Sequence, residues 1–200
     1  MTKEDGDPAF DRAVRALDSQ EPGITVGSCI LANPEVAEAV SEAINFGRGE
    51  RQLLHAWCVM PNHVHIVASL MGGVSLPQYT HSIKSYTAHK INAMLSTTGT
   101  VWERESFDHV IRTAEQFAWF CEYTEQNPVK SGQCATASDW LYGSAHPSRT
   151  VDPLTGWIDP RKTPFARIRS RGELPHLEKC AATYFLTFRL RDAVRPKPGS

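Results

Sequence analysis

Two histidines separated by one residue, His63 and His65, are the first side chains whose types and spacing could do chemistry. In an extended strand, alternate side chains point to the same face, so both imidazoles would project together, about 6–7 Å apart along the strand. Two imidazoles arranged in this way can hold one divalent metal ion. A bare His-x-His also occurs as a pair of partly exposed strand histidines, so the metal interpretation needs a matching element elsewhere in the chain.

The matching element is Tyr123, which is followed one helical turn later by Asn127. The apolar residues of this segment recur with helical spacing and define a buried stripe: Phe117, Phe120, Cys121 and Thr124. Tyr123 lies roughly 100° or more from the centre of that stripe and Asn127 lies on its flank, so the two side chains are neighbours. Such a pair would place a nucleophile beside a metal site. Taken alone, a tyrosine and an asparagine in these positions are more often a rim aromatic and a helix C-cap.

Two extended runs, Leu53 to Met60 and His63 to Leu70, would position the histidines as a hairpin closed by Pro61-Asn62. In the second run, the side chains between and beyond the histidines would face a core: Val64, Ile66 and Ala68.

Further elements are predicted around this hairpin. A helix begins at Pro34, and a second covers Leu76 to Leu95, with Lys84 and Lys90 off its buried stripe, where they could meet phosphates. A strand occupies about 107–112, and a third helix starts at Thr113 and is expected to stop at Gln126, before Asn127-Pro128. A short helix is also predicted from Pro8 to Leu17.

The composition suits one compact domain with extensions, because 41% of the 200 residues are hydrophobic. No apolar run approaches the roughly 20 residues needed to span a bilayer, and the acidic N-terminus does not resemble a signal peptide. The five cysteines form no C-x-x-C pair, so we expect reduced packing residues in a cytosolic protein.

Charge is distributed unevenly although the net charge is only −1. Residues 1–50 carry 4 Lys/Arg against 10 Asp/Glu, whereas residues 161–200 carry 10 against 3. This basic stretch could contact a polyanion or could be an ordinary solvated face.

Three motifs carry a family resemblance: Met60 to His65, Trp102 to Arg112, and Tyr123 to Gly132. Over roughly residues 30–145 they resemble the single-tyrosine HUH transposases, and especially the REP-associated tyrosine transposases. The resemblance implies that His63 and His65 bind Mg²⁺ or Mn²⁺, that Asn127 completes the metal site and that Tyr123 is the nucleophile. It departs from the family at Glu103, where Gln is usual, and at Thr124, where a bulky apolar residue is usual.

The resemblance also implies a DNA partner. The basic and aromatic residues expected to contact DNA lie in and beside the motifs and in the C-terminal stretch: Lys84, Lys90, Trp102, Arg104, Arg112, Lys130, Arg167, Arg169, Arg171 and Lys179.

The order of the chain differs from the family pattern. Family members open with a strand of the type x-Phe-x-Thr-Phe-Arg-Leu, whereas here such a strand comes late, at 183–190. The chain therefore resembles a circularly permuted member, with a core over 1–143, a linker and basic segment over 144–170, and a permuted segment over 171–200.

The fold implied is an α+β ferredoxin-like sandwich with an appended helix that carries Tyr123. Its four-stranded antiparallel sheet would have the order 4-1-3-2, with the first strand supplied by the C-terminus. Strand 183–190 should then pair with both the 63–70 strand and the 107–112 strand.

The function implied is nicking and joining of single-stranded DNA at hairpin-type elements through a 5′-phosphotyrosine intermediate. Two alternatives stay open: a non-catalytic binder of DNA hairpins, and a metal-dependent nuclease that does not use the tyrosine. We expect a bacterial, cytoplasmic and nucleoid-associated protein with no membrane partner. It would act as a monomer or as a homodimer, with strand exchange between subunits as one option.

Overall fold

The structure, a computed structural model, describes residues 28–71, 73–149, 166–171, 174–179, 182–191 and 195–196. The expected helix from Pro8 to Leu17 lies outside these residues. The principal helices are α2 (Pro34–Asn45), α3 (Leu76–Met94) and α4 (Ala114–Lys130). The central strands are β1 (Gln52–Val59), β2 (His63–Leu70), β4 (Phe107–Val110) and β7 (Thr183–Arg189).

Short elements complete the described part of the chain. They are η1 (Ile30–Ala32), β3 (Thr97–Thr98), η2 (Ala137–Asp139), β5 (Ala166–Arg171), β6 (Leu174–Lys179) and β8 (Arg195–Pro196). β3 pairs with β8, and β5 pairs with β6, so each pair forms a small sheet of its own.

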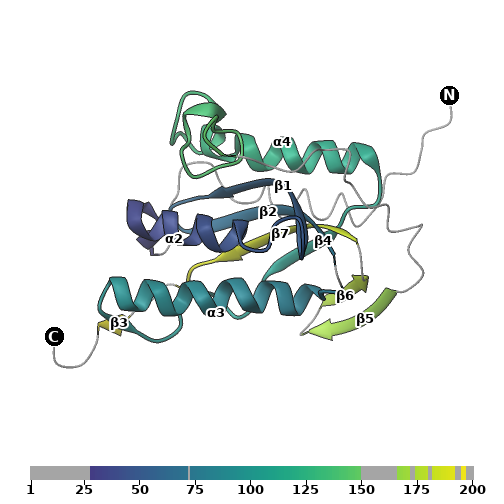
Figure 1. Ribbon diagram of the computed structural model, residues 1–200, viewed down its shortest axis with the longest axis horizontal. Helices are drawn as coiled ribbons and strands as arrows, with labels where there is room; N and C mark the ends of the chain where they lie inside the picture. The colour runs from purple at the N-terminus through teal and green to yellow at the C-terminus, as the bar shows by residue number, and fades with distance from the viewer. Residues whose placement is uncertain are drawn as a thin grey trace.

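The four central strands form one antiparallel sheet in the order β1-β2-β7-β4. β7, which comes late in the chain, lies between β2 and β4, and it pairs with both within its own chain (Figure 1). Both pairings agree with the sequence prediction. The predicted α+β fold with a four-stranded antiparallel sheet is therefore confirmed.

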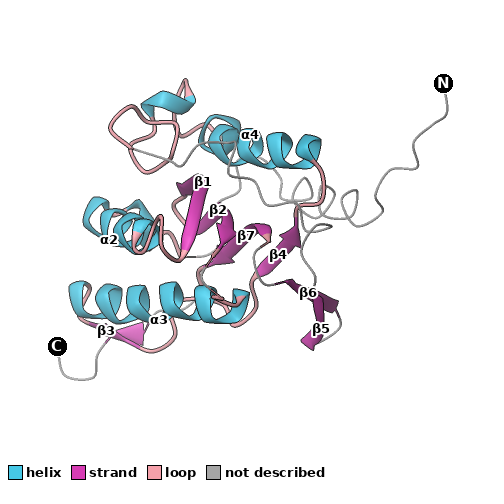
Figure 2. Cartoon of the chain, turned by 45° about the vertical axis from the view of Figure 1, so that its right-hand side comes forward, coloured by secondary structure: helices cyan, strands magenta, loops and turns pink. Residues whose placement is uncertain are grey.

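Helices cover both faces of this sheet. α2 and α3 lie on one face and α4 lies on the other, which is visible in two orientations (Figures 1 and 2). The side chains of β7 divide as strand alternation requires: Tyr184, Leu186 and Phe188 join the core under α2 and α3, and Phe185 joins the core under α4.

Local signals in the sequence explain where the helices begin. The Asn33 side chain caps α2 by accepting from the Glu35 backbone N–H at 2.9 Å. Ser75 and Gln78 form a capping box at α3, and Thr113 accepts from the Gln116 backbone N–H at 3.2 Å to start α4.

β1 is an edge strand of the sheet, and the segment that follows α4 covers its outer side. Gly143 makes an antiparallel bridge with Cys58, and the Ser144 backbone N–H donates to the Trp57 carbonyl at 2.8 Å. A Cβ at Gly143 would meet the Trp140 ring at 3.3 Å, so a residue without a side chain suits this close approach. The covered strand cannot recruit another chain along this stretch.

The described helices include none that is long and apolar enough to cross a membrane.

Candidate functional site: a histidine pair facing a tyrosine helix

The hairpin turn brings the two histidines to one end of the sheet. The Met60 backbone N–H donates to the His63 carbonyl at 2.8 Å, which closes the turn through Pro61-Asn62. The turn is tied to its surroundings, because the Asn62 carbonyl accepts from Leu190 at 2.9 Å and the Pro61 carbonyl accepts from Leu31 at 3.1 Å. The pair therefore stands on a fixed part of the backbone.

The two imidazoles converge as predicted on the same face of β2. Their Nε2 atoms lie 3.0 Å apart. The Nδ1 of His63 is 2.6 Å from the Asn62 Oδ1, and the Nδ1 of His65 is 2.8 Å from the Thr187 Oγ1. Because a carboxamide oxygen only accepts, the Nδ1 of His63 carries its proton, and its Nε2 presents a lone pair to the gap.

Burial keeps both rings neutral. It lowers the pKa of His63 to about 4, the positive charge of Arg189 contributes in the same direction, and a side-chain hydrogen bond with Asn127 opposes the fall. Burial also lowers the pKa of His65, assisted by His63 and Arg189. Neutral imidazole is the form that ligates metals, so the pair is ready to bind a cation near neutral pH.

Tyr123 packs directly on this pair from α4. Its ring lies edge-on to the His65 ring at 5.5 Å between centroids and is stacked on Trp119 at 5.1 Å. Tyr123 is only 7% exposed, which is more buried than its helical phase predicts. The reason is that the Phe185 ring of the sheet also packs on it, with 6.0 Å between the ring centroids. The Lys130 Nζ lies 5.0 Å above the Tyr123 ring.

Asn127 reaches the pair because α4 is longer than the sequence predicted. The expected end at Gln126 is wrong: the helix continues through Pro128 to Lys130. Pro128 is buried in the fold, and the Asn127 carbonyl still accepts from the Ser131 backbone N–H at 3.0 Å. Packing thus outweighs the local preference of the residue before proline, and Asn127 serves as an interior helical residue beside His63 rather than as a C-cap.

The donor set consists of two imidazole nitrogens and one amide group. Two nitrogen ligands at right angles on an ion with bonds of about 2.1 Å would lie about 3.0 Å apart, which fits the separation of the pair. Among the described residues, no group of three or more His, Cys, Asp or Glu could hold a metal ion. A metal here would thus depend on Asn127 in addition to the histidines.

Residues 31–127 match the family model described as "Transposase IS200 like". The REP-associated tyrosine transposase of Escherichia coli K12 is 27% identical over 94 residues, which are 46% of this chain and 54% of that protein. The putative REP-associated tyrosine transposase of Haemophilus influenzae is 27% identical over 101 residues, 46% of this chain and 57% of that protein.

A solved structure of a REP-associated tyrosine transposase bound to a REP hairpin is also similar. The TM-score is 0.50 at 23% identity, and the match covers 64% of this chain and 75% of that chain. The chain resembles the REP-associated tyrosine transposases. The alignments span little more than half the length of the two curated relatives.

Two of the residues predicted to contact DNA make contacts within the protein. Trp102 is 3% exposed, and its indole N–H donates to the Thr87 Oγ1 at 2.9 Å in the core. The Lys84 Nζ donates to the Glu103 carbonyl at 2.8 Å and to the Ser106 Oγ at 2.7 Å. Both side chains thus hold the loop before β4 against α3, and their contact with DNA stays a prediction.

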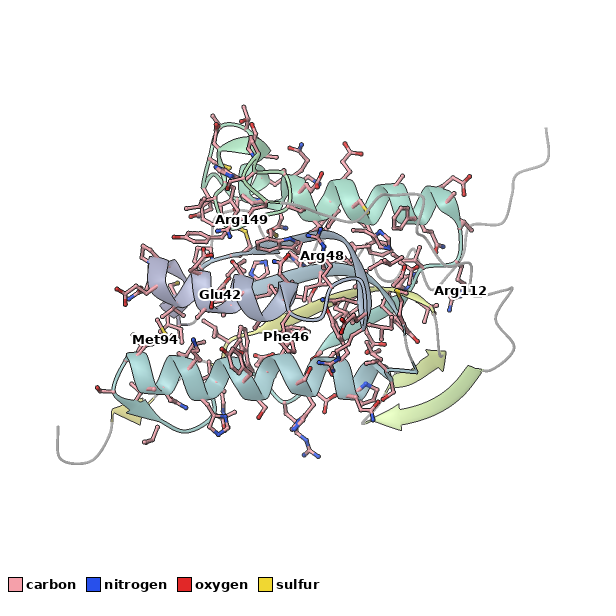
Figure 3. All side chains as sticks on the ribbon, in the orientation of Figure 1. Glu42, Phe46, Arg48, Met94, Arg112 and Arg149 are labelled. Atoms are coloured by element: carbon pink, nitrogen blue, oxygen red, sulfur yellow. The ribbon has the colours of Figure 1, made fainter. Side chains whose placement is uncertain are left out.

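The remaining cations lie at different places. Lys130 ends α4 beside Tyr123, whereas Arg112 lies at the opposite end of that helix (Figure 3), roughly 25 Å away by helical rise. Lys90 is exposed on α3 with its Nζ 5.6 Å above the Tyr86 ring, and Arg104 is exposed in the loop before β4. Arg167, Arg169, Arg171 and Lys179 fall on the β5–β6 hairpin, where the structure describes only the backbone pairing.

Sequence reasoning missed two residues of β7 at the site, Thr187 and Arg189. In the register, His65 is opposite Thr187 and His63 is opposite Arg189. Because alternate residues of a strand share a face, Thr187 and Arg189 lie on one face of the 183–190 strand. The sequence does not show which face of β7 lies on the side of the histidines. The pairing of β2 with β7, which are distant in sequence, determines this.

Proposed function

We propose that the protein nicks and joins single-stranded DNA at hairpin-type elements through a covalent bond between Tyr123 and a 5′ phosphate. The observation that carries the proposal is the convergence of Tyr123 and Asn127 of α4 on His63 and His65 of β2. The similar proteins are named REP-associated tyrosine transposases, and one is described with a REP hairpin, which supports a hairpin DNA partner.

In the proposed reaction, the Tyr123 oxygen attacks the phosphorus of a DNA phosphodiester. The Tyr–O–P bond forms as the P–O3′ bond breaks, and the proton lost by the phenol is balanced by the proton gained by the free 3′-hydroxyl. The covalent intermediate keeps the phosphate in an ester bond, so another 3′-hydroxyl can reverse the step and join a new strand. The stacked Trp119 and the edge of His65 hold the phenol in place for attack.

A divalent ion, Mg²⁺ or Mn²⁺, fits the residues present. The Nε2 atoms of His63 and His65 and the side chain of Asn127 would hold it. Such an ion would polarise the scissile phosphate and offset its developing charge. Asn62 and Thr187 would keep both imidazole rings oriented toward the ion, because they bind the Nδ1 atoms of His63 and His65.

We further propose that the chain is a circularly permuted member of the family. β7 follows the site in the chain but lies at the centre of the sheet, and the family model ends at residue 127, before β7 begins. On this proposal residues 1–143 form the core without its first strand, 144–170 connect, and 171–200 supply that strand. Deleting residues 175–200 should abolish cooperative folding, because β2 and β4 would lose their shared partner.

The test of the proposed function uses a labelled DNA hairpin with single-stranded flanks, incubated with the full chain and Mn²⁺. We expect a covalent protein–DNA adduct on a denaturing gel that disappears completely in Tyr123→Phe. Phenylalanine keeps the ring that Trp119 and Phe185 contact, so folding should be unchanged.

Other outcomes decide between the alternatives. Binding without any adduct would indicate a hairpin-binding module, and cleavage that survives Tyr123→Phe would indicate a nuclease that does not use the tyrosine. Titration of Mn²⁺ into His63→Ala tests the metal site separately. Unchanged affinity in that variant would contradict the proposed ligands.

A further inference from the structure

Arg189 is the last residue of β7 and stands next to the histidine pair. Its Cα is paired with that of His63 across the antiparallel ladder. Thr187, two residues earlier, bonds His65 through its hydroxyl, which fixes the face of β7 that meets the pair. Since alternate residues of a strand share a face, the Arg189 side chain leaves the sheet on the same side as the imidazoles.

The guanidinium is placed for a ligand rather than for packing. β7 is buried from Thr183 to Phe188, and Arg189 is its exposed residue. Within the part of the chain that the structure describes, the Arg189 side chain has no hydrogen bond or ion pair. Its backbone is held nonetheless, because the Arg189 carbonyl accepts from the Glu103 N–H at 2.9 Å.

Arg189 brings a positive charge to the histidine pair from β7. Lys130 of α4 adds a second exposed cation above the Tyr123 ring. Two exposed cations beside the tyrosine and the histidines suit an anionic ligand.

We infer that Arg189 binds a DNA phosphate beside the histidine pair and orients it for attack by Tyr123. The planar guanidinium can donate two parallel hydrogen bonds to phosphate oxygens, which fixes orientation as well as position. This inference rests on the proposed function for its partner, single-stranded DNA. It assigns to β7 a second role beyond completing the sheet.

The first test measures binding without chemistry. The probe is a fluorescent DNA hairpin with single-stranded flanks, and the proteins carry Tyr123→Phe and contain no added metal. We expect Arg189→Gln to weaken binding by at least about tenfold and to reduce the salt slope of affinity by about one. Arg189→Lys should recover part of the affinity but not the fixed orientation.

The matched control is Arg51→Gln, which removes one positive charge just before β1. β1 runs from Gln52 to Val59, and His63 follows the turn at its far end, so Arg51 lies roughly 25 Å from His63 along the strands. Affinity should change little in this variant. Equal losses in Arg189→Gln and Arg51→Gln would overturn the inference, because they would show only a general effect of charge.

A second test identifies the phosphate. Single methylphosphonates, which remove the charge of one phosphate, are placed along the flank in turn. At the phosphate that Arg189 binds, the substitution should weaken the parent protein but have little further effect on Arg189→Gln. Additive losses at every position would overturn the inference.

The proposed function and the phosphate role of Arg189 can be contradicted independently of each other. With Tyr123 restored and Mn²⁺ present, Arg189→Gln should slow adduct formation at saturating DNA, and Arg189→Lys should restore it in part. If the wild-type protein forms no adduct, the proposed function fails, yet the phosphate role of Arg189 is still decided by the binding and methylphosphonate tests.

Discussion

The two faces of the central sheet are built from the same strands but from different kinds of side chain. Toward α2 and α3 the buried residues are apolar, as with Val64 and Ile66 of β2 and Leu186 and Phe188 of β7. Toward α4 the same strands bury histidine, serine and threonine among aromatic rings. The first face provides burial, and the second face carries the histidine pair and Tyr123.

The polar face is stable because its groups are paired across strands. The His55 Nε2 lies 2.8 Å from the Ser69 Oγ, which lies 2.6 Å from the Thr183 Oγ1. His65 and Thr187 form a second such row at the site. Buried polar groups cost free energy unless they are hydrogen-bonded, so these rows allow a polar face inside a folded protein. A slip of one residue in β7 would exchange the two faces, which makes register essential to the site.

The largest effect is expected on the apolar face. Phe188 is 1% exposed and packs edge-on against Trp102 at 6.1 Å. Phe188→Ala should lower the free energy of unfolding by about 3–5 kcal/mol, because it removes buried surface and leaves a cavity. Urea denaturation measures this loss, and Phe188→Leu should lose less. A loss below about 1 kcal/mol would show that this face is not the main source of stability.

An intermediate effect, of a different kind, is expected on the polar face. Thr187→Val removes the hydroxyl that meets the Nδ1 of His65 and keeps the shape of the side chain. Stability should fall by only about 1 kcal/mol, whereas Mn²⁺ affinity and adduct formation should fall by about 10–100-fold, because His65 loses its orienting partner. Isothermal titration with Mn²⁺ and a single-turnover adduct assay measure both.

Thr183→Val is the matched control, because it makes the same change on the same strand and face. Thr183 belongs to the other row, with Ser69, so its loss should affect stability and leave Mn²⁺ affinity unchanged. If the two variants lowered Mn²⁺ affinity equally, the second row would not be specific to the site.

Alternation and helical spacing predicted much of this arrangement. They placed His63 and His65 on one face of β2. They also gave α2 and most of α3, whose last residue, Met94, is 39% exposed (Figure 3). These features depend on neighbours in sequence, which is why periodicity finds them.

The features that the sequence did not reveal depend mainly on contacts between distant segments. Nothing local shows that Lys84 reaches the loop at Glu103, or that the Trp102 indole finds Thr87 in the core. The early end predicted for α4 followed from Pro128 alone, whereas packing of Pro128 and Asn127 keeps the helix intact. Arg189 was assigned no role because its importance comes from its pairing with His63.

The smallest effect is expected outside both faces, at an ion pair that joins the segment after α4 to α2. Arg149 (Figure 3) donates to both carboxylate oxygens of Glu38, at 3.0 and 2.6 Å. The Glu38 side chain is 42% exposed, so solvent screens much of the attraction. Glu38→Gln should therefore cost less than about 1 kcal/mol at neutral pH.

The pH dependence of that cost follows from the sign of the pKa shift. The hydrogen bond from Arg149 lowers the pKa of Glu38 below its usual value, and the positive charge of Arg149 adds to the effect. The stabilisation is thus present above the pKa of the unfolded chain and is lost as the pH falls through the folded pKa. The difference in stability between wild type and Glu38→Gln should shrink to zero in acid. If the difference in stability between wild type and Glu38→Gln persisted at acidic pH, packing rather than charge would hold this segment on α2.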